Sequence, residues 1–130
     1  MLFFDKKKKI LVTDNDNFIH ILFQAMLEKR DYELLAAVDG AQCIEIARKK
    51  VPDLIIMDLM MPGVSGLEAV RTIRADPKTK NIPILVCTVL DWGKEIELCL
   101  QAGANDYIIK PFDENKVRAA IEKLLELPPA

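Results

Sequence analysis

The chain has 130 residues, of which 51% are apolar and 29% are charged, and its formal net charge is −2. This length and composition predict a single globular domain with a sizeable core and exclude a disordered chain. Nucleic acid is not expected as a direct partner, because no basic surface dominates. The apolar start, residues 1–4, is too short for a signal peptide or a membrane span, so we expect a cytoplasmic protein.

The three cysteines, Cys43, Cys87 and Cys99, are widely spaced and odd in number. None of them forms a C-x-x-C pair, so the sequence indicates neither a disulfide framework nor a zinc site. We expect reduced thiols in the core of a cytosolic protein.

Five short β-rich runs alternate with five helical segments, and they predict one α/β domain over residues 1–130 with its core at about 8–126. The expected strands cover residues 10–13, 34–38, 54–57, 82–87 and 106–109. The expected helices cover residues 18–30, 41–50, 66–75 and 91–102, and a last helix follows its cap at Asp113. This alternation predicts a parallel sheet with helices on both faces.

The first helix carries the only histidine of the chain, His20. Together with Gln24 and Glu28 it recurs every fourth residue, which predicts a polar, solvent-facing stripe. We therefore expect His20 to be a surface residue rather than a catalytic group or a ligand.

Polar residues follow four of the five expected strands: Asp14, Asp58, Thr88 and Lys110. The carboxyl ends of parallel strands share one edge of a sheet, so these residues are expected to meet there. Carboxylates that face each other need a cation, and Mg²⁺ is the natural one for oxygen ligands. A lysine, a hydroxyl and a metal ion around one carboxylate form a site for a transferred phosphoryl group. Each residue alone has a structural explanation, but their joint occurrence favours a site.

These residues resemble those of response regulator receiver domains of two-component signalling, of the chemotaxis-regulator type. The resembling motifs are residues 10–16 (ILVTDND), 58–66 (DLMMPGVSG), 83–88 (PILVCT) and 102–112 (AGANDYIIKPF). They cover essentially the whole chain, and the set in this order is specific although no single motif is.

The resemblance implies a flavodoxin-like, doubly wound (βα)5 fold with strand order 2-1-3-4-5. It implies that Asp58 accepts a phosphoryl group from a histidine kinase or a phosphotransfer protein in a phosphorelay. Lys110 would contact that group, the Thr88 hydroxyl would move onto it, and Tyr107 would rotate into the space that Thr88 leaves. A cis peptide bond before Pro111 is expected. The protein would be no enzyme in the usual sense, since it would catalyse only its own phosphorylation and dephosphorylation.

The metal ligands that the resemblance implies are Asp14, Asp58 and the backbone carbonyl of Met60. The family usually has a second acid after the first strand, where this chain has Asn15. An amide oxygen can coordinate Mg²⁺ but brings no charge, and Asp16 comes one position too late. We therefore expect Mg²⁺ binding that is weakened at the Asn15 position.

Three apolar residues lie where family members regulate access and hydrolysis: Met60, Val89 and Leu90. Val89 replaces a residue that is usually small and is expected to narrow the approach to Asp58. Neither Met60 nor Leu90 can orient an attacking water, so we predict slow loss of the phosphoryl group.

The resemblance also implies an output surface made by the fourth helix, the fifth strand and the fifth helix, which is a candidate surface for a homodimer. We expect no output domain in this chain, which is either a stand-alone regulator or part of a longer protein. An alternative interpretation is a pseudo-receiver that acts as a phosphorylation-independent interaction module. A flavodoxin-type cofactor binder or a small hydrolase is less favoured, because the chain has neither a glycine-rich phosphate loop nor a nucleophile elbow.

Overall fold

Five parallel strands form the central sheet in the computed structural model, which describes residues 7–28, 30–89 and 93–126. The strands are β1 (Lys8–Thr13), β2 (Tyr32–Ala37), β3 (Leu54–Met57), β4 (Ile84–Thr88) and β5 (Asp106–Ile109). Their order is β2-β1-β3-β4-β5, which is the order of flavodoxin-like, doubly wound folds. The predicted fold class is therefore confirmed.

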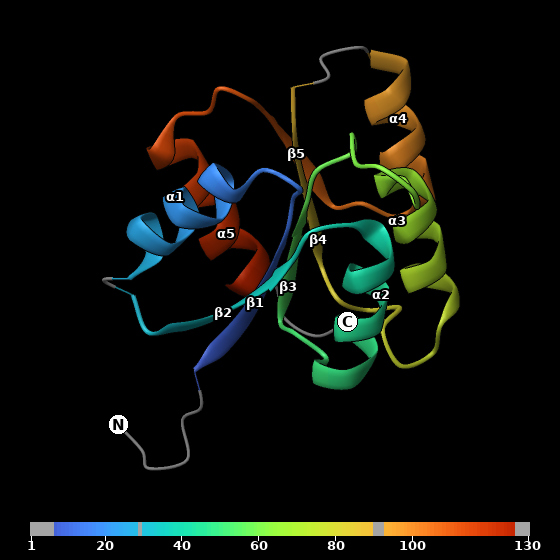
Figure 1. Ribbon diagram of the computed structural model, residues 1–130, viewed down its shortest axis with the longest axis horizontal. Helices are drawn as coiled ribbons and strands as arrows, with labels where there is room; N and C mark the ends of the chain where they lie inside the picture. The colour runs from blue at the N-terminus through green and yellow to red at the C-terminus, as the bar shows by residue number, and fades with distance from the viewer. Residues whose placement is uncertain (1–6, 29, 90–92, 127–130) are drawn as a thin grey trace.

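Helices cover both faces of this sheet, as the alternating pattern predicts (Figure 1). They are α1 (Asn17–Leu27), α2 (Gly40–Lys50), α3 (Gly66–Ala75), α4 (Gly93–Ala102) and α5 (Glu114–Glu126). Helices α1 and α5 pack on one face, and α2, α3 and α4 pack on the other (Figure 1). None of the helices in the described part of the chain has the length and hydropathy that a membrane crossing requires.

The core consists of two apolar layers, one on each face of the sheet. On β1, Ile10 and Val12 face the layer of α1 and α5, where Phe23 and Val117 are fully buried. Leu11 faces the opposite layer, which lies under α2, α3 and α4. Strands β3 and β4 are buried along their whole length, because they lie in the middle of the sheet with helices on both sides.

Short polar residues begin several of these helices. The side chains of Asp16, Asp39 and Ser65 accept hydrogen bonds from the first turns of α1, α2 and α3. The predicted cap of the last helix is also confirmed, since the Asp113 side chain accepts a hydrogen bond from the Asn115 N–H at 2.8 Å.

Several predicted boundaries differ from the structure by one to three residues. Helix α1 ends at Leu27 rather than at residue 30, and β2 is shifted toward the N-terminus relative to the predicted 34–38. Strand β4 begins at Ile84, and Pro83 lies just outside it because proline cannot donate a ladder hydrogen bond. The predicted helix start at Asp91 lies outside the described residues.

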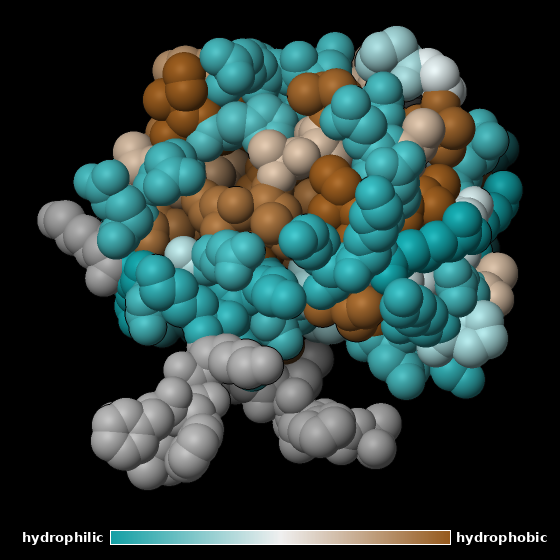
Figure 2. Space-filling view, turned by 60° about the horizontal axis from the view of Figure 1, so that its bottom comes forward, coloured by the Kyte–Doolittle hydropathy of each residue, from teal (hydrophilic) through white to brown (hydrophobic). Residues whose placement is uncertain are grey.

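The apolar residues of the chain are not all buried. Figure 2 shows an apolar area on one face of the molecule, bordered by hydrophilic residues. In α1, Ile19 and Phe23 are buried, but Phe18 is 63% exposed. The three cysteines are buried and free, as predicted.

Candidate functional site

Backbone hydrogen bonds extend the sheet by one residue beyond β1, β3 and β5, and these three residues carry the charged side chains of the site. The Asp14 N–H donates to the Ala37 carbonyl at 3.1 Å, and the Asp58 N–H donates to the Thr13 carbonyl at 3.0 Å. The Lys110 N–H donates to the Thr88 carbonyl at 2.8 Å. Because the ladder holds all three backbones, their side chains start from fixed points at one edge of the sheet.

Lys110 joins the two carboxylates. Its Nζ lies 2.6 Å from Asp14 Oδ2 and 3.5 Å from Asp58 Oδ2. Asp14 is 2% exposed and Asp58 is 7% exposed, so water screens these charges little. Burial by itself lowers the pKa of Lys110, but the hydrogen bond to Asp14 and the charges of Asp58 and Asp14 outweigh it, and the pKa lies above its ordinary value. Lys110 is therefore a cation at neutral pH.

Backbone amides bind the second oxygen of each carboxylate. The Asp16 N–H donates to Asp14 Oδ1 at 2.8 Å, and the Met60 N–H donates to Asp58 Oδ1 at 3.2 Å. Gly66 at the start of α3 packs directly under the Asp58 backbone, where a Cβ would lie 2.6 Å from the Asp58 carbonyl oxygen. A side chain at position 66 would push the loop after β3 away from the sheet, so the glycine helps to place Asp58.

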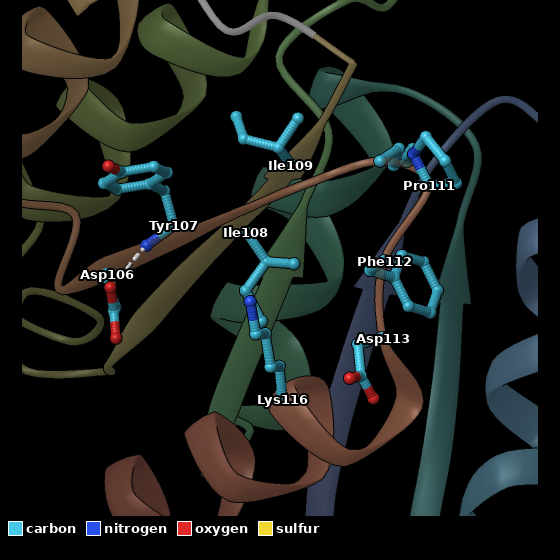
Figure 3. A pocket seen from close by; sticks show the side chains of 9 residues that line it. Asp106, Tyr107, Ile108, Ile109, Pro111, Phe112, Asp113 and Lys116 are labelled. Atoms are coloured by element: carbon cyan, nitrogen blue, oxygen red, sulfur yellow. Dashed lines mark hydrogen bonds between the residues drawn. The ribbon is translucent and has the colours of Figure 1, made fainter.

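Thr88 and Tyr107 lie on neighbouring strands near this cluster. Thr88 ends β4 and is fully buried, whereas Tyr107 on β5 is 43% exposed. Tyr107 pairs with Val86 in the strand register, two residues before Thr88. In Figure 3 the Tyr107 ring extends away from Phe112 and Lys116, on the opposite side of β5. The structure therefore shows Tyr107 in an outward position, and the cis bond between Lys110 and Pro111 is present as predicted.

Asn15 and Asp16 follow Asp14 at the mouth of the site, and both are exposed. The Asp16 carboxylate accepts a hydrogen bond from the Phe18 N–H at 2.9 Å, so it caps α1. Met60 and Val89 are also largely exposed, at 53% and 58%. Leu90, the other residue predicted to affect hydrolysis, lies outside the described residues.

His20 differs from the expectation of a surface residue. Its side chain is half-buried, and its Nε2 lies 2.7 Å from the backbone oxygen of Asp14. Spacing along a helix places a residue on a stripe, but it cannot show that the first turn of α1 lies beside the end of β1. The sequence offered one indication of this contact: His20 lies about one helical turn after the Asp14–Asp16 turn.

The donor set fits a hard divalent cation with few protein ligands. Each carboxylate oxygen of Asp14 and Asp58 accepts a hydrogen bond or ion pair from the described residues, and a carboxylate oxygen can take more than one interaction. The described part of the chain holds no group of three or more His, Cys, Asp or Glu side chains placed for a metal ion. The two carboxylates that are present, Asp14 and Asp58, match the needs of Mg²⁺, which keeps several waters and takes one or two carboxylates from a protein.

Comparisons with known proteins agree with this geometry. The sequence model of the response regulator receiver domain family matches residues 10–122. Protein PilH of Pseudomonas aeruginosa is 34% identical over 123 residues, which cover 90% of this chain and 97% of PilH. The transcriptional regulatory protein PhoP of Bacillus subtilis is 36% identical over 118 residues, which cover 91% of this chain and 48% of PhoP. The chain thus spans about half the length of PhoP.

A solved receiver domain structure is similar to this chain in both sequence and fold. The receiver domain of the sensor histidine kinase PA1611 from P. aeruginosa was crystallised with a magnesium ion coordinated in its active-site cleft. It superimposes with a TM-score of 0.84 at 30% identity, and the match covers 92% of this chain and 98% of that one.

The fold and the site define a flavodoxin-like α/β protein whose strand ends bring two buried carboxylates onto one lysine. With the family match over residues 10–122, the chain belongs to the response regulator receiver domains of two-component signalling.

Proposed function

We propose that Asp58 of this receiver domain accepts a phosphoryl group from the phosphohistidine of a histidine kinase or a phosphotransfer protein, in a Mg²⁺-dependent reaction. The observation that carries this proposal is the position of Lys110 Nζ, 2.6 Å from Asp14 and 3.5 Å from Asp58 in a buried setting. Of the two carboxylates, Asp58 is the one farther from the lysine and the more exposed, so it is the better placed to react.

In the proposed transfer, an Asp58 carboxylate oxygen attacks the phosphorus in line. The bond between phosphorus and the donor imidazole nitrogen breaks, its electron pair stays on that nitrogen, and the imidazole takes up a proton. Lys110 neutralises charge on the phosphoryl oxygens, and the Met60 N–H, 3.2 Å from Asp58 Oδ1, orients the carboxylate.

Asp14, Asp58, the Met60 carbonyl and the Asn15 amide would hold the metal ion, which supplies positive charge to the equatorial phosphoryl oxygens. Asn15 contributes no charge, so we propose a weaker site than one with a second acid. Met60 and Leu90 carry no polar group to orient water, which supports slow hydrolysis of the aspartyl phosphate.

The response to phosphorylation is proposed to involve Thr88 and Tyr107. A phosphoryl group on Asp58 would draw the Thr88 hydroxyl toward it, and Tyr107 would then turn inward from its exposed position on β5. The groove that runs along β5 and into α5, lined by residues 106–113 and Lys116, would change shape with it (Figure 3). The surface of α4, β5 and α5 is therefore the proposed contact for a downstream partner or a second copy.

Asn15 and Val89 are the residues that favour the alternative, a pseudo-receiver that binds partners without phosphorylation. We favour the phosphoacceptor, because Asp14, Asp58 and Lys110 are assembled in contact. In this proposal the protein catalyses only its own phosphorylation and dephosphorylation. The cytoplasm is the proposed compartment, where buried free thiols stay reduced.

The test uses beryllofluoride or acetyl phosphate with Mg²⁺, with and without the variant Asp58→Asn. We expect the wild type to show NMR shift changes with beryllofluoride and to gain the mass of one phosphoryl group from acetyl phosphate. Asp58→Asn should abolish both responses, whereas Asp31→Asn, at an exposed aspartate, should keep them. A wild type that does not respond at any Mg²⁺ concentration would overturn the proposal in favour of the pseudo-receiver.

A further inference from the structure

His20 reaches the metal-binding turn from the first turns of α1. Its ring Nε2 lies 2.7 Å from the backbone oxygen of Asp14. A carbonyl oxygen can only accept a hydrogen bond, so the ring donates its Nε2 proton. The imidazole is half-buried, which makes this contact less exposed to competition from water than a surface hydrogen bond.

This hydrogen bond acts on the peptide unit that joins Asp14 to Asn15. The peptide is planar, so a hold on its oxygen also sets the direction of the Asn15 N–H and of the Asn15 Cα. On the other side of Asp14, the Asp14 N–H is held by the Ala37 carbonyl at 3.1 Å. The two peptide planes that flank Asp14 are therefore both anchored, one by the sheet and one by His20.

Anchoring both planes restrains the backbone dihedral angles of Asp14 and with them the direction of its Cα–Cβ bond, from which the carboxylate extends. The Asp14 carboxylate then meets Lys110 Nζ at 2.6 Å and the Asp16 N–H at 2.8 Å. We propose that His20 is a positioning residue for the metal site: it holds the Asp14–Asn15 peptide so that the Asp14 carboxylate and the Asn15 amide point at the same ion.

The proposed role of His20 matters more in this chain because position 15 is an amide. A carboxylate at position 15 would be drawn to a cation by its charge, whereas a neutral amide coordinates only when its oxygen is already directed at the ion. Mg²⁺ binding by a chain with Asn15 therefore depends more on how the backbone at position 15 is held. This inference rests on the proposed Mg²⁺ site but assigns a role to a residue that the proposed reaction does not use.

Three variants separate positioning from simple packing. His20→Gln keeps an N–H donor at a similar distance from the helix, and His20→Leu removes it while filling the space. Gln24→Leu, one turn further along the same face and exposed, is the matched control for an apolar change on α1. Stability in urea with EDTA, and Mg²⁺ affinity by calorimetry, are measured for each variant.

We expect His20→Leu to weaken Mg²⁺ affinity by about tenfold, as loss of an outer hydrogen bond to a metal ligand does. His20→Gln should restore most of this loss, and Gln24→Leu should leave the affinity unchanged. In metal-free protein, ¹⁵N NMR should show the proton of His20 on Nε2, and His20→Leu should shift the Asn15 amide resonance. In a protein that already carries Asn15→Asp, the change His20→Leu should lower Mg²⁺ affinity by a smaller factor than it does in the wild type.

Wild-type affinity in His20→Leu, or an equal loss in His20→Gln and His20→Leu, would overturn the inference. A proton on Nδ1 instead of Nε2 would overturn it as well. Failure of the proposed function looks different: the wild type itself would then bind no Mg²⁺, while the metal-free NMR signature of the His20 contact would persist.

Discussion

At the scale of single residues, two buried ion pairs of the site meet at Lys110. Its side chain is 12% exposed, and its ammonium group contacts carboxylates that come from the ends of β1 and β3. Two buried carboxylates this close to one cation are stable only as a set, because each charge has given up much of its hydration. A phosphoryl group transferred to Asp58 would contact the same charged groups.

Replacement of Lys110 by methionine should show how strongly this set is coupled. Lys110→Met leaves Asp14 and Asp58 without their cation, and we expect a loss of about 3–5 kcal/mol in the free energy of unfolding at pH 7 with EDTA. Added Mg²⁺ should recover part of the loss, because the metal ion compensates the same carboxylates. Urea titrations with and without Mg²⁺ measure both effects. Lys116→Met, at an exposed lysine, is the control, and an equal effect there would contradict the prediction.

Asn15→Asp should strengthen the metal site. A further negative charge, beside those of Asp14 and Asp58, within coordination distance of the ion is worth about 1 kcal/mol or more, so we expect Mg²⁺ affinity to rise by about tenfold. Calorimetric titration of the wild type and the variant gives the two dissociation constants. Asn17→Asp adds the same charge nearby without reaching the ion and should change the affinity far less; equal gains would show that only general electrostatics is at work.

At the scale of elements, Arg74 on α3 ties together the loops that precede β4 and β5. Its Nη1 donates to the carbonyls of Lys80 and Ile82 at 3.0 and 2.7 Å, and its Nε donates to the Gly103 carbonyl at 3.0 Å. Gly103 has a φ of +121°, and a Cβ there would lie 2.8 Å from the Arg74 side chain. Burial lowers the pKa of Arg74, and its hydrogen bonds to carbonyl groups compensate for the lost hydration.

Arg74→Met should therefore destabilise the domain by about 2–4 kcal/mol, since the partly buried carbonyl groups of Ile82 and Gly103 lose their donor. Urea unfolding followed by circular dichroism measures the loss. Arg71→Met, on the exposed side of the same helix, should cost less than about 0.5 kcal/mol. Similar losses in the two variants would show that helix propensity, and not the hydrogen bonds of Arg74, is responsible.

The end of α2 contains a strained residue. Val51 has a φ of 44°, and its N–H donates to the Ala47 carbonyl at 2.9 Å as the helix terminates. A β-branched side chain is unfavourable in this left-handed conformation, where glycine is the usual residue. We expect Val51→Gly to stabilise the protein by about 1 kcal/mol, measured as a higher urea midpoint. Val38→Gly, at an exposed valine without positive φ, should destabilise it; a loss in both variants would contradict the argument.

At the scale of the whole molecule, the two apolar layers bury three thiols and thereby make stability depend on alkaline pH. Burial raises the pKa of Cys43 to about 11 and that of Cys87 to about 12, and it raises the pKa of Cys99 as well. Above the ordinary thiol value of 9.0, the unfolded chain releases these protons while the folded protein keeps them. The contribution of these thiols to stability is therefore full below pH 9 and is lost as the pH rises above it.

Between pH 8 and pH 10 we expect the free energy of unfolding to decrease by about 2–3 kcal/mol from these thiols. The double variant Cys43→Ala with Cys87→Ala should show a clearly smaller decrease, measured by urea titration at each pH under reducing conditions. If the two proteins lose the same amount, the pH dependence comes from other groups. Native thiols should also react slowly with alkylating reagents at pH 8.

Much of the architecture could be predicted because each element carries its own signal. The predicted 54–57, 66–75 and 106–109 match β3, α3 and β5 residue for residue. The apolar run before Asp58 and the start of the helix after Ser65 can each be recognised from a few neighbouring residues. The predicted boundaries of α1 and β2 were less accurate. The local sequence there favours both continuing and ending the element, and packing decides where it ends.

The sequence alone therefore determined the order of strands and helices, the polar residues at the strand ends and the family to which these motifs belong. It could do so because hydrophobic period, caps and turns act over a few residues. The tertiary structure decided what those residues touch: Lys110 on both Asp14 and Asp58, Arg74 on two loops, and His20 on the Asp14 carbonyl. These contacts join positions far apart in the chain or on different elements. The pairing of strands brings Lys110 to Asp14 and Asp58, and the packing of helices onto the sheet brings Arg74 and His20 to their partners.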